Sequence, residues 1–343
     1  MHVPDGFIDA PVSAATGVVA AAAIAVSLRG ARRELDERTA PLAGLVAAFI
    51  FAVQMLNFPV AAGTSGHLLG GALAAILVGP YTGVLCVSVV LLMQGILFAD
   101  GGLTALGVNI TDMAITTTVV AYAVFRGLVK VLPRTRRSIT AASFTAALLS
   151  VPAAALVFTL LYSLGGTTDV SLGKVATAMI GVHVLIGVGE AAITALTVGA
   201  VIAVRPDLVH GARGLEQRLK LRVNGELVDA PRQLEPVAAR GTSRRRLWIG
   251  GLVTSLLLAG FVSFYASSNP DGLEKVAADH GIDQQTKEHA SADSPLADYG
   301  VRDVDDARLS GGLAGVIGVG VTVVAGTGVF WAVRKRRSTS QAA

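Results

Sequence analysis

Residues 176–204 read ATAMIGVHVLIGVGEAAITALTVGAVIAV. A helix needs roughly 20 predominantly apolar residues to cross a bilayer, and this run exceeds that length while holding one acidic side chain, Glu190. The whole chain shares this character, since it has a mean hydropathy of +0.63 and 15% charged residues over 343 residues. Soluble domains carry roughly 25% charged residues. We therefore predict an all-α fold, a polytopic helical bundle in a membrane.

Eight further apolar runs are separated by polar segments. They cover about 10–28, 42–59, 67–79, 82–98, 108–128, 139–163, 247–266 and 311–333. The run at 67–79 is short and stops at Gly79-Pro80, which suits a helix enclosed by others. The pattern predicts seven transmembrane helices followed by two more.

The basic residues orient these predicted spans. The pI of 9.4 raises the question of nucleic acid, but 23 of the 28 Lys and Arg residues fall in four clusters between apolar runs. The clusters occupy 29–38, 126–137, 205–246 and 334–337. With nine crossings, all four lie on one side, which the positive-inside rule makes cytoplasmic. We expect the N-terminus outside, the C-terminus inside, the bilayer as surroundings and no nucleic-acid partner.

The first two residues form a candidate metal chelate. No basic segment precedes the first apolar run, as it would in a secretory signal, and a bulky second residue disfavours removal of Met1. We expect a mature chain that begins with a free amine beside His2. The amine, the His2 amide nitrogen and the His2 ring suit a late first-row divalent ion. The alternative is a solvated terminus.

His67 is the candidate fourth ligand. It lies in the predicted outer loop Gly63-Thr64-Ser65-Gly66-His67-Leu68-Leu69-Gly70, whose glycines permit tight turns. Four nitrogens in a plane suit Ni²⁺ or Cu²⁺, with Co²⁺ as a further candidate, whereas Zn²⁺ prefers a tetrahedron. The single cysteine, Cys86, lies in an apolar run and is expected to be a small buried residue.

Further polar residues lie near the outer ends of the predicted spans. They are expected either to hydrogen-bond the metal ligands or to cap helices. The candidates are Asp5, Gln54, Asn57, Asp100, Asn109 and Asp112. Two more, His183 and Glu190, share one face of the 176–204 helix. They are expected to compensate each other in the bundle interior, to pass the ion or to dock a partner.

Three motifs carry a family resemblance. The start MHVPDGF, the loop GTSGHLLGG and the segment HVLIGVGEAAIT together resemble the M-type substrate-binding component of energy-coupling-factor nickel and cobalt transporters, the CbiM or NikM family. The resemblance covers about 1–205. Residues 247–343 resemble the small N component, with its hallmark Pro270-Asp271-Gly272-Leu273-Glu274 at the outer end of a span. Residues 206–246 are the expected basic cytoplasmic linker, and 267–309 the extracytoplasmic loop.

The resemblance implies a specific function. It assigns transported Ni²⁺ or Co²⁺, with no cofactor, to Met1, to the backbone nitrogen and ring of His2 and to His67. It implies a transmembrane coupling subunit like CbiQ or NikQ and ATP-binding cassette subunits like CbiO or NikO. The chain itself has no G-x-x-x-x-G-K-[ST] loop, so ATP hydrolysis is expected in these partners. Pro4-Asp5-Gly6 stands where cobalt members more often have Met-Glu-Gly, which favours nickel.

Two alternatives belong to other classes of protein. A binding component for an organic micronutrient would need an aromatic-lined site, yet aromatic residues make up 5% of the chain. An intramembrane enzyme would need a motif such as H-E-x-x-H, which does not occur here.

The acidic loop 267–309 has ten Asp and Glu against four Lys and Arg. We expect its Ser-, Asp- and His-rich tail to lack fixed structure and the loop to contact the N-terminal segment directly. Because all three predicted ligands precede Gly70, we expect metal binding to need no residue of 247–343, and uptake to need them.

Overall fold

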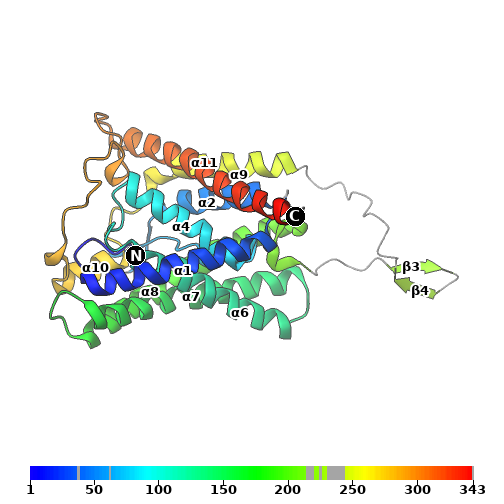
Figure 1. The fold of residues 1–343 in the computed structure, drawn as a ribbon, viewed down its shortest axis with the longest axis horizontal. Helices are drawn as coiled ribbons and strands as arrows, with labels where there is room; N and C mark the ends of the chain where they lie inside the picture. Colours follow the sequence, from blue (N-terminus) through cyan, green and yellow to red (C-terminus); the bar gives the residue numbers. More distant parts are fainter. Residues whose placement is uncertain (37–38, 62, 214–219, 224–225, 230–243, 342–343) are drawn as a thin grey trace.

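Long helices dominate the structure. The computed structural model describes residues 1–36, 39–61, 63–213, 220–223, 226–229 and 244–341, and its helices lie side by side along the long axis (Figure 1). Seven helical segments of this part are long and apolar enough to cross a membrane. They are Ala10–Glu34 (α1), Pro80–Leu97 (α4), Leu106–Val131, Arg136–Gly165 (α7), Leu172–Val204 (α8), Arg245–Tyr265 and Ala307–Lys335. The prediction of a polytopic all-α membrane protein is confirmed.

Two of the predicted spans, 42–59 and 67–79, form shorter helices inside the bundle. Helix α2 is Ala40–Gln54 and α3 is Gly71–Val78, and nearly every residue of both is buried. Between them, the strands Phe58–Pro59 (β1) and Ser65–Gly66 (β2) pair antiparallel. Gly70, with φ of 90°, starts α3 in the left-handed region. The chain therefore enters the bundle as an extended loop that carries His67, and only then becomes helical.

A sharp corner joins α3 to α4. Gly79 has φ of 104°, and Pro80 opens α4 at a position where a missing N–H does no harm. The Glu34 carboxylate at the end of α1 accepts hydrogen bonds from Tyr81 N at 3.3 Å and Thr82 N at 2.7 Å. A side-chain acceptor thus satisfies amides that the start of α4 would otherwise leave open.

The predicted fifth span changes its helical form along its length. It consists of Leu106–Asn109 (α5), the π-helical segment Ile110–Thr116 (η1) and Thr117–Val131 (α6). Such π segments are uncommon and are often found at functional sites. Here the irregular part lies at the level of the N-terminal residues, since Asn109 contacts Val3.

The C-terminal helices pack on the preceding ones. They are Arg244–Gly260 (α9), the 3₁₀ turn Val262–Tyr265 (η4), Gly272–His280 (α10) and Ala307–Gln341 (α11). Helix α11 lies so close to α2 that a Cβ on Gly44 would come within 2.8 Å of Thr327 N. Two short 3₁₀ turns, Asp283–Gln285 (η5) and Ala297–Tyr299 (η6), lie in the loop between α10 and α11.

The predicted linker 206–246 is described only in part. It begins with the 3₁₀ turns Pro206–Leu208 (η2) and His210–Ala212 (η3). The strands Lys220–Val223 (β3) and Glu226–Asp229 (β4) pair antiparallel. Residues 214–219, 224–225 and 230–243 of the predicted linker lie outside the described residues.

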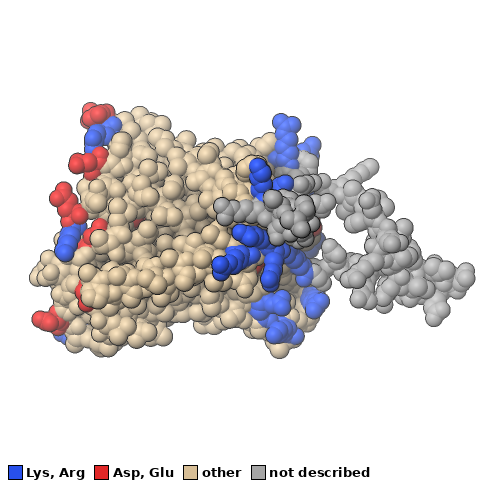
Figure 2. Space-filling view, in the orientation of Figure 1, with Lys and Arg blue, Asp and Glu red and all other residues tan. Residues whose placement is uncertain are grey.

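Charge is segregated along the long axis. In Figure 2, described Lys and Arg side chains gather at one end of the molecule, and Asp and Glu are prominent at the other. Helix α11 ends at the basic end, while α10 lies at the acidic end (Figure 1). Cys86 is fully buried in α4, as predicted.

Candidate metal centre

Asn109 holds the N-terminal segment inside the protein. Its Oδ1 accepts a hydrogen bond from Val3 N at 2.7 Å, and its Nδ2 donates to Val3 O at 3.1 Å. Gly102 N also donates to Val3 O, at 2.9 Å. Met1 is 2% exposed and His2 8%. The first residues thus enter a buried environment with their backbone groups paired.

Asp5 fixes the turn that follows. Its carboxylate accepts hydrogen bonds from Thr104 N at 2.8 Å, from the Thr104 hydroxyl and from Leu103 N at 3.3 Å. Its backbone oxygen accepts from Lys287 N at 2.9 Å. Asp5 therefore ties the N-terminal segment to the loop after α4 and to the loop after α10.

The loop that carries His67 is held by two buried side chains. Glu190 of α8 accepts hydrogen bonds from Leu69 N at 2.5 Å and Gly70 N at 3.0 Å, and Gln54 Nε2 donates to Leu69 O at 3.1 Å. His67 Nδ1 lies 3.0 Å from Leu68 O. Because a carbonyl accepts only, this contact places an N–H on Nδ1.

The Met1 amine lies beside the other ring nitrogen of His67. Met1 N is 2.7 Å from His67 Nε2, in a buried setting. The His2 and His67 rings stack, with 5.2 Å between their centroids and 17° between their planes. The three residues that the sequence predicts as metal ligands, far apart along the chain, are therefore brought together.

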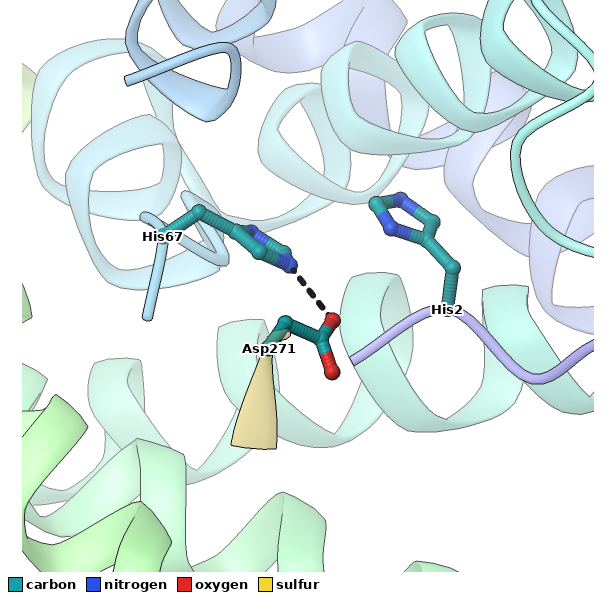
Figure 3. Close-up of side chains that lie close together, drawn as sticks. All are labelled: His2, His67 and Asp271. Atoms are coloured by element: carbon teal, nitrogen blue, oxygen red, sulfur yellow. Dashed lines mark ion pairs between the residues drawn. The ribbon is translucent and has the colours of Figure 1, made fainter. Parts of the chain in front are cut away.

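Asp271 joins the same cluster. Its Oδ2 lies 2.5 Å from Met1 N and 3.4 Å from His67 Nε2. Figure 3 shows this carboxylate pointing into the space between His67 and His2. Burial disfavours the charged form, but the Met1 amine and His67 outweigh it and hold the pKa of Asp271 well below its usual range. In the described part of the chain, ligand atoms of His2, His67 and Asp271 lie within 4.8 Å of one another.

The His2 ring takes part in a closed set of contacts. Its Nδ1 lies 3.2 Å from Asp100 Oδ1, and its Nε2 lies 3.2 Å from Gln94 Oε1. Gln94 Nε2 donates to the Tyr299 hydroxyl at 2.9 Å, and that hydroxyl donates to Asp100 Oδ2 at 2.5 Å. The set runs from His2 through Asp100, Tyr299 and Gln94 back to His2.

The His2 ring is neutral near pH 7. Burial lowers the pKa of His2 to about 4; Asp100 opposes this change and the Met1 amine adds to it. A neutral imidazole carries one N–H, so it can donate to only one of its two neighbours, Asp100 or Gln94. The other ring nitrogen then faces an oxygen, and both of these atoms are hydrogen-bond acceptors. Such a contact is unfavourable, and a bound cation or a turn of the ring would relieve it.

The six other outer candidates have separate roles. Asp100 contacts a predicted ligand side chain, Asn109 and Asp5 position the N-terminal segment, and Gln54 supports the His67 loop. Asn57 O accepts from Ser267 N at 2.7 Å, and its Oδ1 is buried without a hydrogen-bond partner among the described residues. Asp112, in the π segment, has no hydrogen-bond partner among the described residues for either carboxylate oxygen.

His183 and Glu190 do not compensate each other. Glu190 binds backbone amides of the His67 loop, as described above. His183 Nδ1 lies 2.7 Å from Met179 O, one turn earlier on α8, and no described residue is a hydrogen-bond partner of its Nε2. The interpretation as a mutual pair is therefore wrong, because each side chain finds a nearer backbone partner.

Three residues of the site were missed by sequence reasoning. Gln94 lies at the end of a long apolar run, where a single amide gave no distinct signal. Asp271 and Tyr299 lie in the C-terminal loop, which we expected to be dispensable for binding. That expectation is at odds with the contact between Asp271 and Met1. The hallmark Pro270-Asp271-Gly272-Leu273-Glu274 was the available signal for Asp271.

The tail of the acidic loop also differs from expectation. The Ser294 hydroxyl donates to Leu97 O at 2.6 Å, and Asp298 N donates to Phe98 O at 2.9 Å. Tyr299 stacks on Phe98, with 4.9 Å between the ring centroids. A cavity of about 770 Å³ lies under this loop, lined among others by His2, His67, Asp100, Asp271 and Tyr299. The loop has fixed contacts and covers the site.

Family models match two parts of this chain. The model described as "Cobalt uptake substrate-specific transmembrane region", CbiM, matches residues 2–208. The chain belongs to the CbiM family. A second model, the PDGLE domain, matches residues 245–335. The resemblance noted from the sequence is thereby confirmed for both parts.

Relatives of this CbiM family member are transport proteins. The putative fused nickel transport protein NikMN of Archaeoglobus fulgidus is 41% identical over 212 residues, which cover 61% of this chain and 68% of that protein. The cobalt transport protein CbiM of Geobacter sulfurreducens is 32% identical over 300 residues, covering 82% and 79%.

A solved structure is similar as well. The crystal structure of a truncated transition metal transporter has a TM-score of 0.53 and 26% identity, and the match covers 59% of this chain and 99% of that one. Together with the apolar helices, these matches make this CbiM family chain a multi-pass membrane protein and a component of transition-metal uptake.

Proposed function

We propose that the chain is the substrate-specificity component of an energy-coupling-factor importer and captures Ni²⁺ or Co²⁺ outside the cell. The observation that carries this proposal is the 2.7 Å approach of the Met1 amine to His67 Nε2 in a buried site. An amine and an unprotonated imidazole nitrogen at this separation form a pair of donors for one late first-row ion. The similarity to nickel and cobalt transport proteins supports the same substrate class.

The proposed donors are the Met1 amine, the His2 amide nitrogen, His2 Nδ1 and His67 Nε2. Binding requires the amine to lose its proton, because the protonated form has no lone pair. It also requires His2 Nδ1 to leave Asp100, since a nitrogen that faces a carboxylate cannot bind the ion at the same time. Gln94 Oε1, 3.2 Å from His2 Nε2, is placed to accept the ring N–H that then lies on Nε2.

The proposed direction of transport follows from charge. Most of the Lys and Arg side chains drawn in Figure 2 gather at the end of the molecule away from α10, whose N-cap Asp271 belongs to the site, and basic ends of membrane proteins face the cytoplasm. This supports a binding site that faces outward, with the N-terminus outside and the C-terminus inside. Transport then needs partners that hydrolyse ATP. We propose a coupling subunit and ATP-binding cassette subunits, in line with the absence of a phosphate-binding loop from the sequence.

The proposed division of the chain has three parts. Residues 1–205 hold the nitrogen donors, 206–246 link the two units on the cytoplasmic side, and 247–343 form the N-type unit with its outer loop. The choice between nickel and cobalt rests on Pro4-Asp5-Gly6, which favours nickel.

Thermal stabilisation of the purified chain tests this proposal. A ligand that binds only the folded state raises the unfolding temperature by mass action. We expect Ni²⁺ and Co²⁺ to raise it in a panel with Cu²⁺, Zn²⁺ and a set of vitamins. Stabilisation by a vitamin and by none of the metals would favour the organic-micronutrient alternative and contradict the proposal.

A further inference from the structure

Three atoms of the site form a compact triangle. Met1 N, His67 Nε2 and Asp271 Oδ2 are separated by 2.7, 2.5 and 3.4 Å. When nitrogen or oxygen ligands lie about 2.0–2.1 Å from a metal ion, two ligands at right angles are about 2.9 Å apart. The triangle therefore has the size of one face of a coordination shell around a single ion.

A fourth donor group, the His2 ring, lies close to the triangle. A ligand atom of His2 is within 4.8 Å of those of His67 and Asp271, so the His2 ring lies beside the triangle. The His2 ring stacks on His67, and its Nδ1 must turn away from Asp100 to face the triangle. All these groups are buried, which limits competition from water.

Asp271 is held so that its two oxygens have different tasks. Its Oδ1 accepts from Leu273 N at 2.7 Å and Glu274 N at 2.9 Å and caps α10, while Glu274 Oε2 accepts a hydrogen bond from Asp271 N at 2.8 Å. This capping box fixes the carboxylate and leaves Oδ2 to face the Met1 amine and His67. A helix cap alone would need only Oδ1.

The backbone before Asp271 is fixed on the His67 loop. Ser65 N donates to Pro270 O at 2.8 Å, and the Ser65 hydroxyl donates to Asn269 O at 2.8 Å. On the other side, a Cβ on Gly272 would lie 3.0 Å from His183 Cε1. The approach of Oδ2 to the nitrogen cluster is thus built into the contacts of both neighbours.

We propose that Asp271 is a ligand of the transported ion and that the C-terminal unit thereby supplies an oxygen donor beside the nitrogen donors. This rests on the function proposed above. The site is then shared between the two units, because the ion binds to atoms of both.

Asp271→Asn in the full chain tests the assignment. Asparagine caps helices as well as aspartate does, so α10 is preserved while the anionic ligand is removed. Asp279→Asn is the matched control, because Asp279 lies on the same helix and pairs with Lys275 on the exposed surface. Both purified variants are titrated with Ni²⁺ and with Co²⁺. Nickel X-ray absorption then measures the number and type of ligands in each.

We expect Asp271→Asn to weaken Ni²⁺ binding by more than the ~10-fold that loss of an outer partner causes, and to lower the coordination number by one oxygen. Asp279→Asn should match the unaltered chain in both measurements. If Asp271→Asn does not yield folded protein, Asp271→Ser, which also keeps a capping oxygen, is judged by the same two readouts.

A different pattern would overturn the proposal. If the Asp271 variant binds Ni²⁺ as tightly as the unaltered chain or more tightly, with the same coordination number, Asp271 is only a counter-ion of the protonated amine. Failure of the proposed function is distinct from this result, because the unaltered chain would then bind neither metal.

Discussion

Residues 1–208 and residues 245–335 bring different chemistry to one site. The first unit carries amine and imidazole nitrogens, each close to a buried partner: Asn109 for the N-terminal segment and Glu190 for the His67 loop. The second unit brings oxygens, the Asp271 carboxylate and the Tyr299 hydroxyl, on a loop that covers the first. The helices of the first unit therefore position the nitrogen groups, whereas the position of the oxygen groups depends on how the second unit docks.

Extension of the N-terminus should have the largest effect. One added glycine before Met1 converts the amine into an amide, which is no longer a basic nitrogen, and places an extra residue in a buried position. We expect saturable Ni²⁺ and Co²⁺ binding by the purified chain to disappear in titration. The same residue added after Ala343 is the control and should leave binding intact. Unchanged affinity in the extended chain would show that the amine is not a ligand.

Replacement of His67 should be nearly as severe. His67→Ala removes a proposed ligand, so the loss should exceed the ~10–100-fold typical of partners that only orient ligands. Its matched control is His289→Ala, because His289 lines the same cavity but contacts Gly101 O at 3.2 Å. Metal titration of both variants, each checked for monodispersity, shows whether His67 is a ligand. A drop of only a few-fold for His67→Ala would exclude it as a ligand.

The helical bundle was largely predictable because its signal is local. A run such as 176–204 leaves a membrane helix as the main option, since backbone groups in lipid must pair within the segment. The irregular parts of the bundle were harder to predict. The π segment Ile110–Thr116 and the extended chain before Gly71 arise from packing against neighbouring elements, and such contacts leave no periodic pattern in the sequence.

The clustering of Met1, His2 and His67 was predictable because they stand in short motifs. Few other donor groups lie in those segments, and on that ground we expected the three residues to bind one metal ion. Gln94 and Tyr299 are single polar residues in ordinary surroundings, and their roles depend on contacts across about 200 residues of chain, as the 205-residue separation between them shows. Likewise, His183 and Glu190 do not pair with each other because each side chain has a nearer backbone partner, which the sequence pattern does not reveal.

Glu190→Gln should disturb the placement of the nitrogen groups from within the bundle. Glutamine offers one carbonyl oxygen to the two amides of Leu69 and Gly70, and its NH₂ group is a donor like them. An unsatisfied buried amide costs about 1–3 kcal/mol, so we expect lower thermal stability and roughly 10-fold weaker Ni²⁺ binding, as for other residues that orient ligands.

Thr194→Val is the matched control for Glu190→Gln. Thr194 lies four residues further along α8, and its buried hydroxyl oxygen has no hydrogen-bond partner in the described part of the chain. Valine has nearly the same shape, so neither stability nor affinity should fall. If Glu190→Gln behaves like this control, the His67 loop is held by other contacts.

Tyr299→Phe should have the smallest effect, and it tests the contribution of the second unit apart from Asp271. The ring keeps its stacking on Phe98, but Asp100 loses a donor and Gln94 loses an acceptor. The hydrogen bond to Gln94 is neutral and contributes about 0.5–1.5 kcal/mol net, and the one to the Asp100 carboxylate about 1.5–3 kcal/mol. Because Tyr299 contacts none of the proposed ligands directly, only part of this reaches the metal, and with 1.4 kcal/mol per tenfold we expect Ni²⁺ affinity to change by about 2- to 10-fold. Tyr265→Phe, at an exposed tyrosine of the same unit, serves as the control.

Because Tyr299 orients Asp100 and Gln94 around His2, the change should appear in the affinity and leave the number of metal ligands unaltered in X-ray absorption. A lost ligand in Tyr299→Phe would mean that the covering loop had moved and had taken Asp271 away from the site.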